Sequence, residues 1–307
     1  MSVAAADTDF DGYPDTAYAG DLQGKLWKLA IASDGSLSLA NSGLPLFAAK
    51  DDDNVRQMIT GGIEIALHHV RGQMVFFGTG KYFEVGDNAP VANPQVQTFY
   101  GVWDDPDGSG TVDRGDLQPQ TIGGQTTEDG YELRSVSDDP VDWSSQKGWY
   151  LNLAVGATNR GERFIATPRV ELGNAIITTF TSLGDECDPG GENWLYVLNA
   201  ITGARSLDLG SSGQSGAVLA GTGAPAVAPP IVTTPPETEC RPGIDAGCEI
   251  MGEDEDGNSC VYGDPGCDTL TPSAGAGCMA DVGLVLSTGI RRFATLSCGR
   301  QSWRQMQ

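Results

Sequence analysis

Residues 7–30 read DTDFDGYPDTAYAGDLQGKLWKLA, an acidic turn followed by two short runs of apolar and aromatic residues. The runs cover Thr16–Asp21 and Lys25–Ala30, and Leu22–Gly24 between them has the length and the glycine of a tight turn. A related pattern, NWLYVLNAITG, occupies residues 193–203, and each pattern closes a strand with a turn of the form residue-x-x-Gly. This weak internal repeat is typical of quinoprotein-like β-propeller blades, which stack radially and protect one another's edges.

Further strand-like runs follow along the chain, and no long amphipathic helical pattern interrupts them. With 42 glycines to form turns, the composition predicts an all-β protein. At roughly 40–50 residues per blade, the chain holds three to five blades, and we expect a partial or complete β-propeller. The additional strand runs are 62–68, 73–83, 97–103, 148–153, 162–166, 175–180, 282–286 and 291–295.

The chain is expected to have three regions. Residues 1–210 carry the blades, although residues 104–145 within them are acidic and rich in turn-forming residues, which predicts a surface excursion. Residues 211–280 are dominated by Gly, Ser, Ala, Pro and Thr and then by cysteines, and we interpret them as a low-complexity, Cys-rich insertion. Residues 281–307 regain strand character and are expected to supply the closing strands of the propeller.

The charge balance is strongly acidic. Lys and Arg number 18 and Asp and Glu number 41, so the net charge is −23. Such a surface repels nucleic acid and anionic membranes and suits cations or an ion-rich extracellular medium. Acidity can also serve solubility alone, and that alternative stays open for the bulk of the charge.

The seven cysteines favour disulfides. Five of them fall between residues 240 and 278, in a stretch with too little apolar content to build its own core. Zinc is the weaker alternative, because no Cys-x-x-Cys pair exists and the only histidines are His68 and His69. The odd count leaves one thiol unpaired within this chain. The cysteines are Cys187, Cys240, Cys248, Cys260, Cys267, Cys278 and Cys298.

Disulfides imply export, yet residues 1–6 lack the basic and apolar regions of a signal peptide. No run approaches the ~18 apolar residues of a membrane span, so no transmembrane segment is expected. The chain is therefore either cytosolic or a piece of a longer exported protein. The cysteines fit the second alternative better.

The acidic turn has the spacing of a calcium loop. Asp7, Asp9, Asp11 and Asp15 occupy loop positions 1, 3, 5 and 9, and a glycine at position 6 allows the sharp bend that gathers them. Tyr13, at position 7, would offer its backbone carbonyl. Position 12 is Tyr18 where an EF-hand has a bidentate Glu, and a strand follows in place of a helix. The alternative is an acidic turn without a metal.

A second acidic stretch, residues 105–116, is a weaker candidate for calcium. Its side chains fall at the positions of an EF-hand loop, including position 12, and a glycine again stands at position 6. An arginine inside it and a serine among its ligands weaken the match, and an ordinary solvated loop is the alternative. The candidate ligands are Asp105, Asp107, Ser109, Thr111, Asp113 and Asp116. The shorter run 254–258 is a third, lesser candidate.

Signals for catalysis are weak, and we expect no enzyme. His68 and His69 stand at a strand end, where packing or solvent exposure is the simpler interpretation. No serine sits in a nucleophile elbow, and no glycine-rich phosphate loop follows a strand. We therefore name no catalytic residues.

Six segments together resemble the C-terminal β-propeller of the PilC/PilY family, the type IV pilus tip-associated adhesins. The resemblance covers most of residues 7–210 and the last thirty or so residues. Two features depart from it: the longer N-terminal region of the family is missing, and the cysteine-rich insertion is not typical of it. The matching segments are 7–27, FFGTGKYF at 76–83, FYGVWD at 99–104, GWYL at 148–151 with GER at 161–163, GGENWL at 190–195, and GRQSWR at 299–304.

The resemblance implies a function. It assigns calcium to the loop Asp7–Asp15 and implies roles in pilus biogenesis, surface adhesion and calcium-dependent regulation of twitching motility. It implies minor pilins of the pilus tip complex and a host or abiotic surface as partners. The implied location is the cell surface at the pilus tip, reached through the periplasm. Two alternatives remain: a calcium- and quinone-dependent dehydrogenase-like propeller, motivated by the blade repeats, and a structural exoprotein stapled by calcium.

Overall fold

A computed structural model describes residues 3–184, 190–207, 209 and 215–226, together with the backbone of five later strands. The chain divides into two compact units. The first is Met1–Pro230 with two short later segments, and the second is Ile231–Val285 with Ile290–Gly299. Six of the seven cysteines and the run 254–258 lie outside the described residues, and only the backbone of Cys260 is described, so the disulfides stay a prediction.

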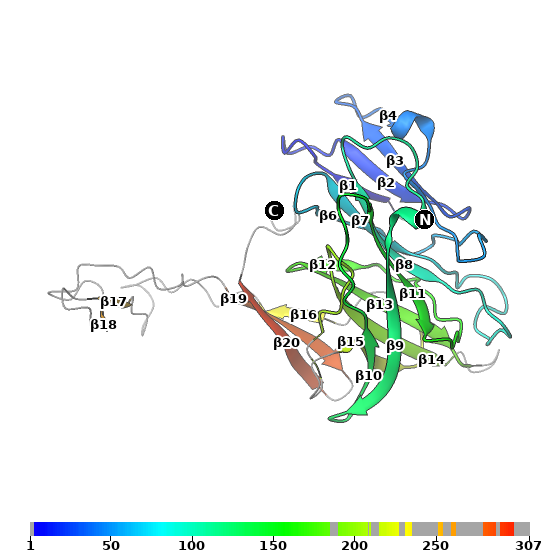
Figure 1. Cartoon of the computed structure of the whole chain (residues 1–307), viewed down its shortest axis with the longest axis vertical. Helices are drawn as coiled ribbons and strands as arrows, with labels where there is room; N and C mark the ends of the chain where they lie inside the picture. The colour runs from blue at the N-terminus through cyan, green and yellow to red at the C-terminus, as the bar shows by residue number, and fades with distance from the viewer. Residues whose placement is uncertain are drawn as a thin grey trace. The chain divides into compact units, whose positions relative to one another are not determined.

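The first unit begins with a five-stranded antiparallel sheet that contains the predicted hairpin (Figure 1). Four strands follow one another in a meander, the arrangement of a propeller blade. A short fifth strand, β5 (Phe47–Ala48), pairs with the free part of β3, and a 3₁₀ turn, η1 (Asn41–Gly43), precedes it. The meander strands are β1 (Val3–Ala6), β2 (Thr16–Gly20), β3 (Lys25–Ile31) and β4 (Leu37–Leu39).

The two repeat patterns form similar turns. The Asp21 carboxylate accepts the N–H two residues on at 2.8 Å, and Asn199 Oδ1 accepts the N–H two residues on at 2.9 Å, in a turn that is one residue longer. Each turn then closes on a glycine with positive φ, Gly24 at 80° and Gly203 at 71°. Only glycine adopts this conformation without a steric penalty, so the glycine shared by the two repeats is explained by the backbone conformation of the turn.

The second sheet of this unit has ten strands. Neighbouring strands are antiparallel except β11 and β9, which run parallel. The end strands β6 and β12 contact each other, so the sheet is nearly closed. A 3₁₀ turn, η2 (Arg114–Asp116), precedes β9. The strand order is β12 (Arg169–Glu171), β13 (Asn174–Ser182), β14 (Gly191–Asn199), β15 (Ser215–Thr222), β10 (Tyr131–Val136), β9 (Gln118–Glu128), β11 (Gly148–Val155), β8 (Thr98–Asp104), β7 (Gln73–Gly78) and β6 (Glu64–Leu67).

Strand β7 is buried on both faces. Phe76 packs in a core cluster with Trp149, whereas Val75 and Phe77 pack in a second cluster with Tyr18 of the first sheet. A strand covered on both sides has no polar face, which explains why QMVFFG does not alternate between apolar and polar residues. The second cluster is the core through which the two sheets of this unit contact each other.

Two sequence expectations about this unit need correction. Residues 104–145 are not simply a surface excursion, because β9 and β10 lie within the ten-stranded sheet. The unit also continues past residue 210, since β15 pairs with both β14 and β10. The small residues of β15 have a steric cause: a Cβ on Gly216 would lie 2.4 Å from a methyl group of Val136. Composition alone cannot distinguish such a closely packed strand from a low-complexity segment.

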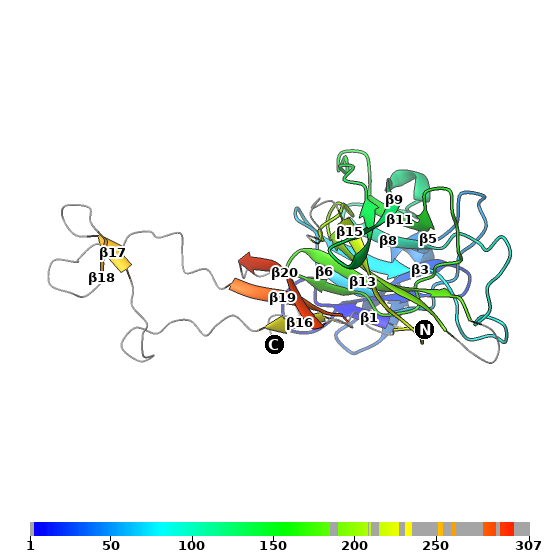
Figure 2. The ribbon, with the colours of Figure 1, turned by 90° about the horizontal axis from the view of Figure 1, so that it is seen from below.

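The second unit contains two small sheets. Strands β16 (Ile231–Thr234), β19 (Met279–Leu286) and β20 (Gly289–Ser297) form one, and β17 (Met251–Glu253) pairs with β18 (Ser259–Val261) in the other (Figure 2). The strands expected over 281–307 to close the propeller thus pair with β16 in a separate sheet.

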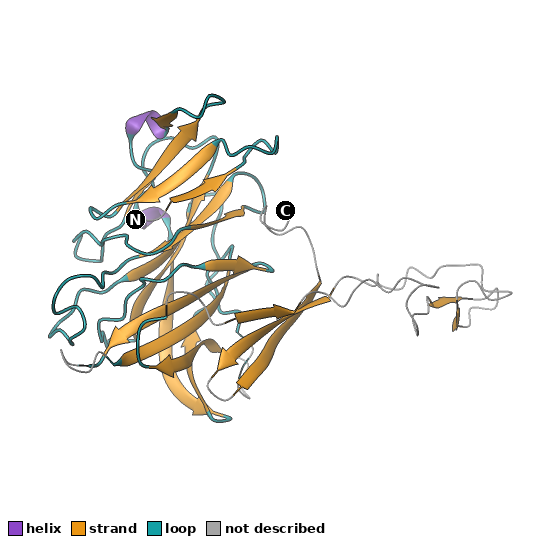
Figure 3. Cartoon of the chain, turned by 180° about the vertical axis from the view of Figure 1, so that it is seen from behind, coloured by secondary structure: helices purple, strands orange, loops and turns teal. Residues whose placement is uncertain are grey.

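Helix is almost absent from the described residues (Figure 3). Only the 3₁₀ turns η1 and η2 interrupt the strands and loops there, in agreement with the all-β prediction. No helix in the described part of the chain has the length and apolar character needed to span a membrane.

Replacing Gly203 by alanine is expected to destabilise the first unit. The new Cβ would lie 2.4 Å from the buried indole of Trp149 in a left-handed backbone conformation, so the cost is roughly 2–4 kcal/mol. Gly35→Ala is the matched control: its φ is 79° but nothing lies within 4 Å, so it should cost only about 1 kcal/mol. Equal unfolding midpoints in urea for the two variants would contradict this account.

Candidate metal site

The acidic loop connects β1 to β2. Its base is closed by the Asp15 N–H, which donates to the Ala6 carbonyl at 3.0 Å. Two residues adopt positive φ, Phe10 at 63° and Gly12 at 97°, and these bends turn the chain back on itself. Because the loop is the turn of a hairpin, its two ends are fixed by the pairing of β1 with β2.

Three of the four predicted carboxylates come together. Asp7, Asp9 and Asp15 each offer an oxygen atom, and these atoms all lie within 4.8 Å of one another. Asp11 is outside this group, and its carboxylate accepts the Tyr13 N–H at 2.8 Å. Within the described ranges, no other group of three or more His, Cys, Asp or Glu side chains converges in this way.

Backbone N–H groups of the loop hold the carboxylates in place. Asp7 accepts from the N–H groups of Phe10 at 2.7 Å and Gly12 at 2.8 Å. Asp15 accepts from the Thr8 N–H at 3.0 Å and from the Thr8 hydroxyl at 2.8 Å. The loop is therefore ordered around its acidic side chains, which still have lone pairs available for a cation.

The carboxyl groups of the loop differ in acidity. The Asp11 N–H lowers the pKa of Asp9, but desolvation and the charges of Asp11 and Asp15 outweigh it, so that pKa lies above its ordinary value. Burial raises the pKa of Asp15, but hydrogen bonds from the Thr16 and Thr8 hydroxyls prevail and lower it. Asp9 thus experiences the mutual repulsion of the cluster, which a cation would relieve.

Tyr18, at the twelfth loop position, is buried in the core. Its hydroxyl donates to Asp104 Oδ2 at 2.6 Å, and Lys28 Nζ lies 2.7 Å from the same oxygen. Burial and the neighbouring carboxylate raise the pKa of Tyr18 well above its ordinary value. Tyr18, which occupies the position of the EF-hand glutamate, therefore joins the two sheets. Asp104 was not predicted as a functional residue, because its only signal in the sequence is a charge at the end of an apolar strand.

The second acidic stretch is neutralised by cationic side chains. Asp105 lies 3.0 Å from both Arg71 and Lys147, and Asp107 also pairs with Arg71. The Asp113 side chain accepts a hydrogen bond from the backbone N–H of Asp116, and the Asp116 side chain accepts one from the backbone N–H of Asp113, so both carboxylates cap η2.

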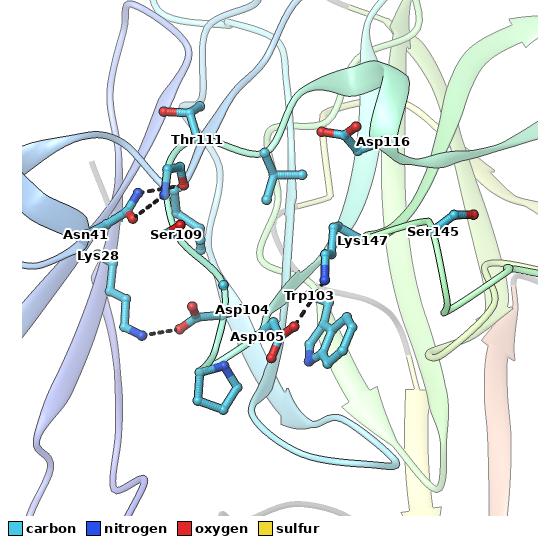
Figure 4. Close-up of a pocket in the computed structure, with 15 residues that line it drawn as sticks. Lys28, Asn41, Trp103, Asp104, Asp105, Ser109, Thr111, Asp116, Ser145 and Lys147 are labelled. Carbon is cyan, nitrogen blue, oxygen red and sulfur yellow. Dashed lines mark hydrogen bonds and ion pairs between the residues drawn. The ribbon is translucent and has the colours of Figure 1, made fainter.

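Figure 4 shows Asp105 directed toward Lys147 and away from Asp116, at a cavity of about 410 Å³. Thr111 also lines this cavity, and its hydroxyl donates to the Pro45 carbonyl at 2.8 Å. Ser109 is another lining residue. The structure does not gather the carboxylates of this stretch, so it offers less support for calcium here than at the first loop.

The histidine pair belongs to an aromatic cluster. The His68 ring is 5% exposed and stacks on Trp103 at a centroid distance of 4.3 Å, with Trp143 edge-on at 4.4 Å. Burial, helped by the adjacent His69, lowers the pKa of His68 to about 4. The ring is therefore neutral near neutral pH, and its surroundings fit the packing interpretation.

Comparison with known proteins identifies the fold. Residues 1–132 match the family model of the PilY1 beta-propeller domain. A type IV pilus biogenesis factor PilY1 homolog of Xylella fastidiosa is 32% identical over 100% of this chain and 21% of its own length. This chain belongs to the PilY1 family. Its all-β fold is that of a PilY1 β-propeller domain.

Other relatives agree with this assignment. The type IV pilus biogenesis factor PilY1 of Pseudomonas aeruginosa is 35% identical over 67% of this chain and 21% of its own length. The crystal structure of the Pseudomonas aeruginosa PilY1 C-terminal domain matches with a TM-score of 0.63 and 28% identity, covering 88% of this chain and 60% of that one. The chain spans about a fifth of the length of these curated relatives.

Stability should fall in acid through His68. The unfolded chain binds a proton at its imidazole near pH 6.5, whereas the folded pKa is about 4. The stabilisation from keeping His68 neutral is complete above pH 6.5. As the pH falls from 6.5 toward 4, protonation of the unfolded chain lowers the free energy of unfolding, by about 2–3 kcal/mol at pH 4.5. His68→Phe keeps the ring stack without the titration, so its urea midpoint should depend less on pH. If the urea midpoints of the wild type and of His68→Phe fall in parallel as the pH is lowered, His68 is not the cause of the loss of stability.

Proposed function

We propose that this chain is the calcium-binding β-propeller of a type IV pilus biogenesis factor, acting in pilus biogenesis, surface adhesion and calcium-dependent regulation of twitching motility. One observation carries the metal assignment: three carboxylate oxygens, from Asp7, Asp9 and Asp15, lie within 4.8 Å of one another in an ordered loop. The relatives are type IV pilus biogenesis factors, which supports the link to pili. By the same reasoning, the partners are minor pilins of the tip complex and a host or abiotic surface.

The donor set suits calcium better than zinc or magnesium. All of the gathered donors are carboxylate oxygens on a largely exposed loop, with neither thiolate nor imidazole among them. Calcium accepts six to eight oxygen ligands in variable geometry, so waters, the Tyr13 carbonyl and a rotated Asp11 can complete the shell. Without a bidentate glutamate, the affinity should be that of extracellular modules, on the order of 10⁻⁴–10⁻³ M.

The loop is connected to the larger sheet by a short path. Asp15 ends the loop, Tyr18 follows three residues later in β2, and its hydroxyl is bonded to Asp104 of β8. A cation that neutralises the carboxylates would fix the start of β2 and thereby the face that this blade presents. Calcium concentration is in this way converted into local order that a pilus partner can recognise.

Calcium titration calorimetry tests the metal site directly. The wild-type chain should bind one calcium ion at the first loop, and Asp9→Asn should weaken binding roughly tenfold or more because it removes one of three gathered charges. Calcium should raise the melting temperature of the wild type more than that of the variant, by mass action. Asp53→Asn, at an exposed carboxylate outside the loop, is the control and should bind normally. Heats that are the same for all three proteins would refute the site.

The link to motility is testable in cells. A strain whose full-length gene carries Asp9→Asn should keep the protein at normal abundance but lose the response of twitching to calcium. The same strain with Asp53→Asn should twitch as the wild type does. Unchanged calcium response in the Asp9→Asn strain would separate the loop from regulation, and normal piliation and twitching after gene deletion would remove the pilus role.

A further inference from the structure

A small cavity of about 210 Å³ lies among three connecting segments of the first unit. Arg56 comes from the β5–β6 connection, Lys81 from the β7–β8 connection and Arg163 from the β11–β12 connection, and all three line the cavity. Its volume is below the roughly 300–1,000 Å³ of typical small-molecule sites, so it suits a single functional group of a ligand.

The charges that line the cavity do not cancel. Asp87 is its only carboxylate among the described residues, and one Asp87 oxygen lies 3.2 Å from Lys81 Nζ. Lys81 also pairs with Glu84. The two guanidinium groups are left over, so the cavity is locally positive in a chain whose net charge is −23.

Few cations of the chain lack a carboxylate partner. Within the described ranges, the lysines and arginines that form no ion pair are Lys25, Lys50, Arg56 and Arg163. Only Arg163 among these four is not exposed, and two of the four line this one cavity.

The partial burial of Arg163 has an electrostatic cost. Burial lowers the pKa of Arg163 below its ordinary value, and the charge of nearby Asp87 only partly offsets this effect. Desolvation also lowers the pKa of Arg134, but Tyr196 and Glu162 outweigh it there, and that pKa is raised. Arg163 therefore lacks the compensation that the other buried guanidinium has, and a bound anion would supply it.

One donor of Arg163 is both fixed and accessible. Its Nε donates to the Gly161 carbonyl at 3.2 Å, and its Nη1 donates to the Lys81 and Asp87 carbonyls at 3.1 Å. Nη2 has no partner in the described part of the chain and is not among the buried atoms that lack one, so it keeps surface open to a ligand. The bonds at Nε and Nη1 hold the planar group, which fixes the direction of the free Nη2 donor.

Arg56 provides a second, more mobile set of donors. Its side chain is exposed and donates to the amide oxygen of Gln23, which is neutral. An exchange of this neutral acceptor for an anion would give a charge-assisted hydrogen bond, which is roughly twice as strong.

The rest of the lining indicates which anion fits. Met58, Val91 and Pro94 also line the cavity, and Val91 is 60% exposed. An anion with a carbon chain would cover these apolar groups, whereas inorganic phosphate would leave them bare and would bring up to two negative charges close to Asp87.

We propose that this cavity binds an organic carboxylate, held by Arg163 and Arg56, with its carbon chain packed on the apolar lining. The carboxylate can belong to a small acid or to the C-terminus of a polypeptide. This site goes beyond the proposed function, because no residue of the acidic loop lines the cavity. Carboxylate binding is therefore expected to be the same in calcium and in chelator.

The test uses the whole chain and four probes: butyrate, an N-acetylated Ala-Ala-Val tripeptide with a free carboxylate, the same tripeptide as its C-terminal amide, and inorganic phosphate. Binding is measured by calorimetry and by the NMR signal of the Arg163 Nε–H group. At least one of the two carboxylates should bind and shift this signal. The amide should bind at least tenfold more weakly than the tripeptide acid, because it has no charge to pair with the guanidinium.

Variants assign the binding to the two arginines. Arg163→Gln should weaken carboxylate binding roughly tenfold or more. Because Arg163 also holds backbone carbonyls, its variant can lose stability, and exposed Arg56 provides a test without that effect. Arg56→Gln should weaken binding roughly twofold to fivefold at an unchanged melting temperature. Lys25→Gln removes another exposed cation without an ion pair, outside the cavity, and should bind as the wild type does.

The outcomes separate the sources of the carboxylate and can refute the site. Butyrate bound as tightly as the tripeptide acid would support a site for small acids, and binding of the tripeptide acid alone would support a polypeptide terminus. The inference is overturned if neither carboxylate binds, if acid and amide bind equally, or if phosphate binds more tightly than both carboxylates. It is also overturned if Arg56→Gln and Lys25→Gln have the same affinity.

Discussion

The buried carboxylate of Asp104 is the interaction on which the first unit depends. It ends β8, is 6% exposed, and holds both Tyr18 and Lys28 of the five-stranded sheet. A carboxylate removed from water is costly unless it is paired and hydrogen-bonded. Losing Lys28 would therefore leave an uncompensated charge at the junction of the two sheets, and losing Tyr18 would remove a hydrogen bond to that charge. The acidic loop precedes β2 directly, so the candidate metal site is linked to this junction through Tyr18.

The ten-stranded sheet has an equivalent anchor in Arg134 of β10. This guanidinium is 1% exposed, donates to Glu162 at 2.6 Å and to the Tyr196 hydroxyl at 2.7 Å, and lies 3.5 Å from the ring centre of Trp194. The contacts join β10 to β14 across β15 and so fix the β9–β10 hairpin within the sheet. A buried guanidinium is stable only where its partners are present, so few other positions in the fold could hold Arg134. This requirement fixes the position of the polar β9–β10 segment, although its strand pattern is weak.

The sequence by itself determined the hairpin of residues 16–30, the all-β class and the spacing that brings Asp7, Asp9 and Asp15 together, because these features depend on near neighbours in the chain. The tertiary structure decided the rest. Asp105 is neutralised by Arg71 and Lys147, and Tyr18 is committed to Asp104, through partners dozens of residues away. The strands β9, β10 and β15 also depend on remote contacts, such as Gly216 against Val136. Local spacing specifies which ligands can converge, but only the folded chain brings together the distant charges that either neutralise a carboxylate or leave it available to bind a cation.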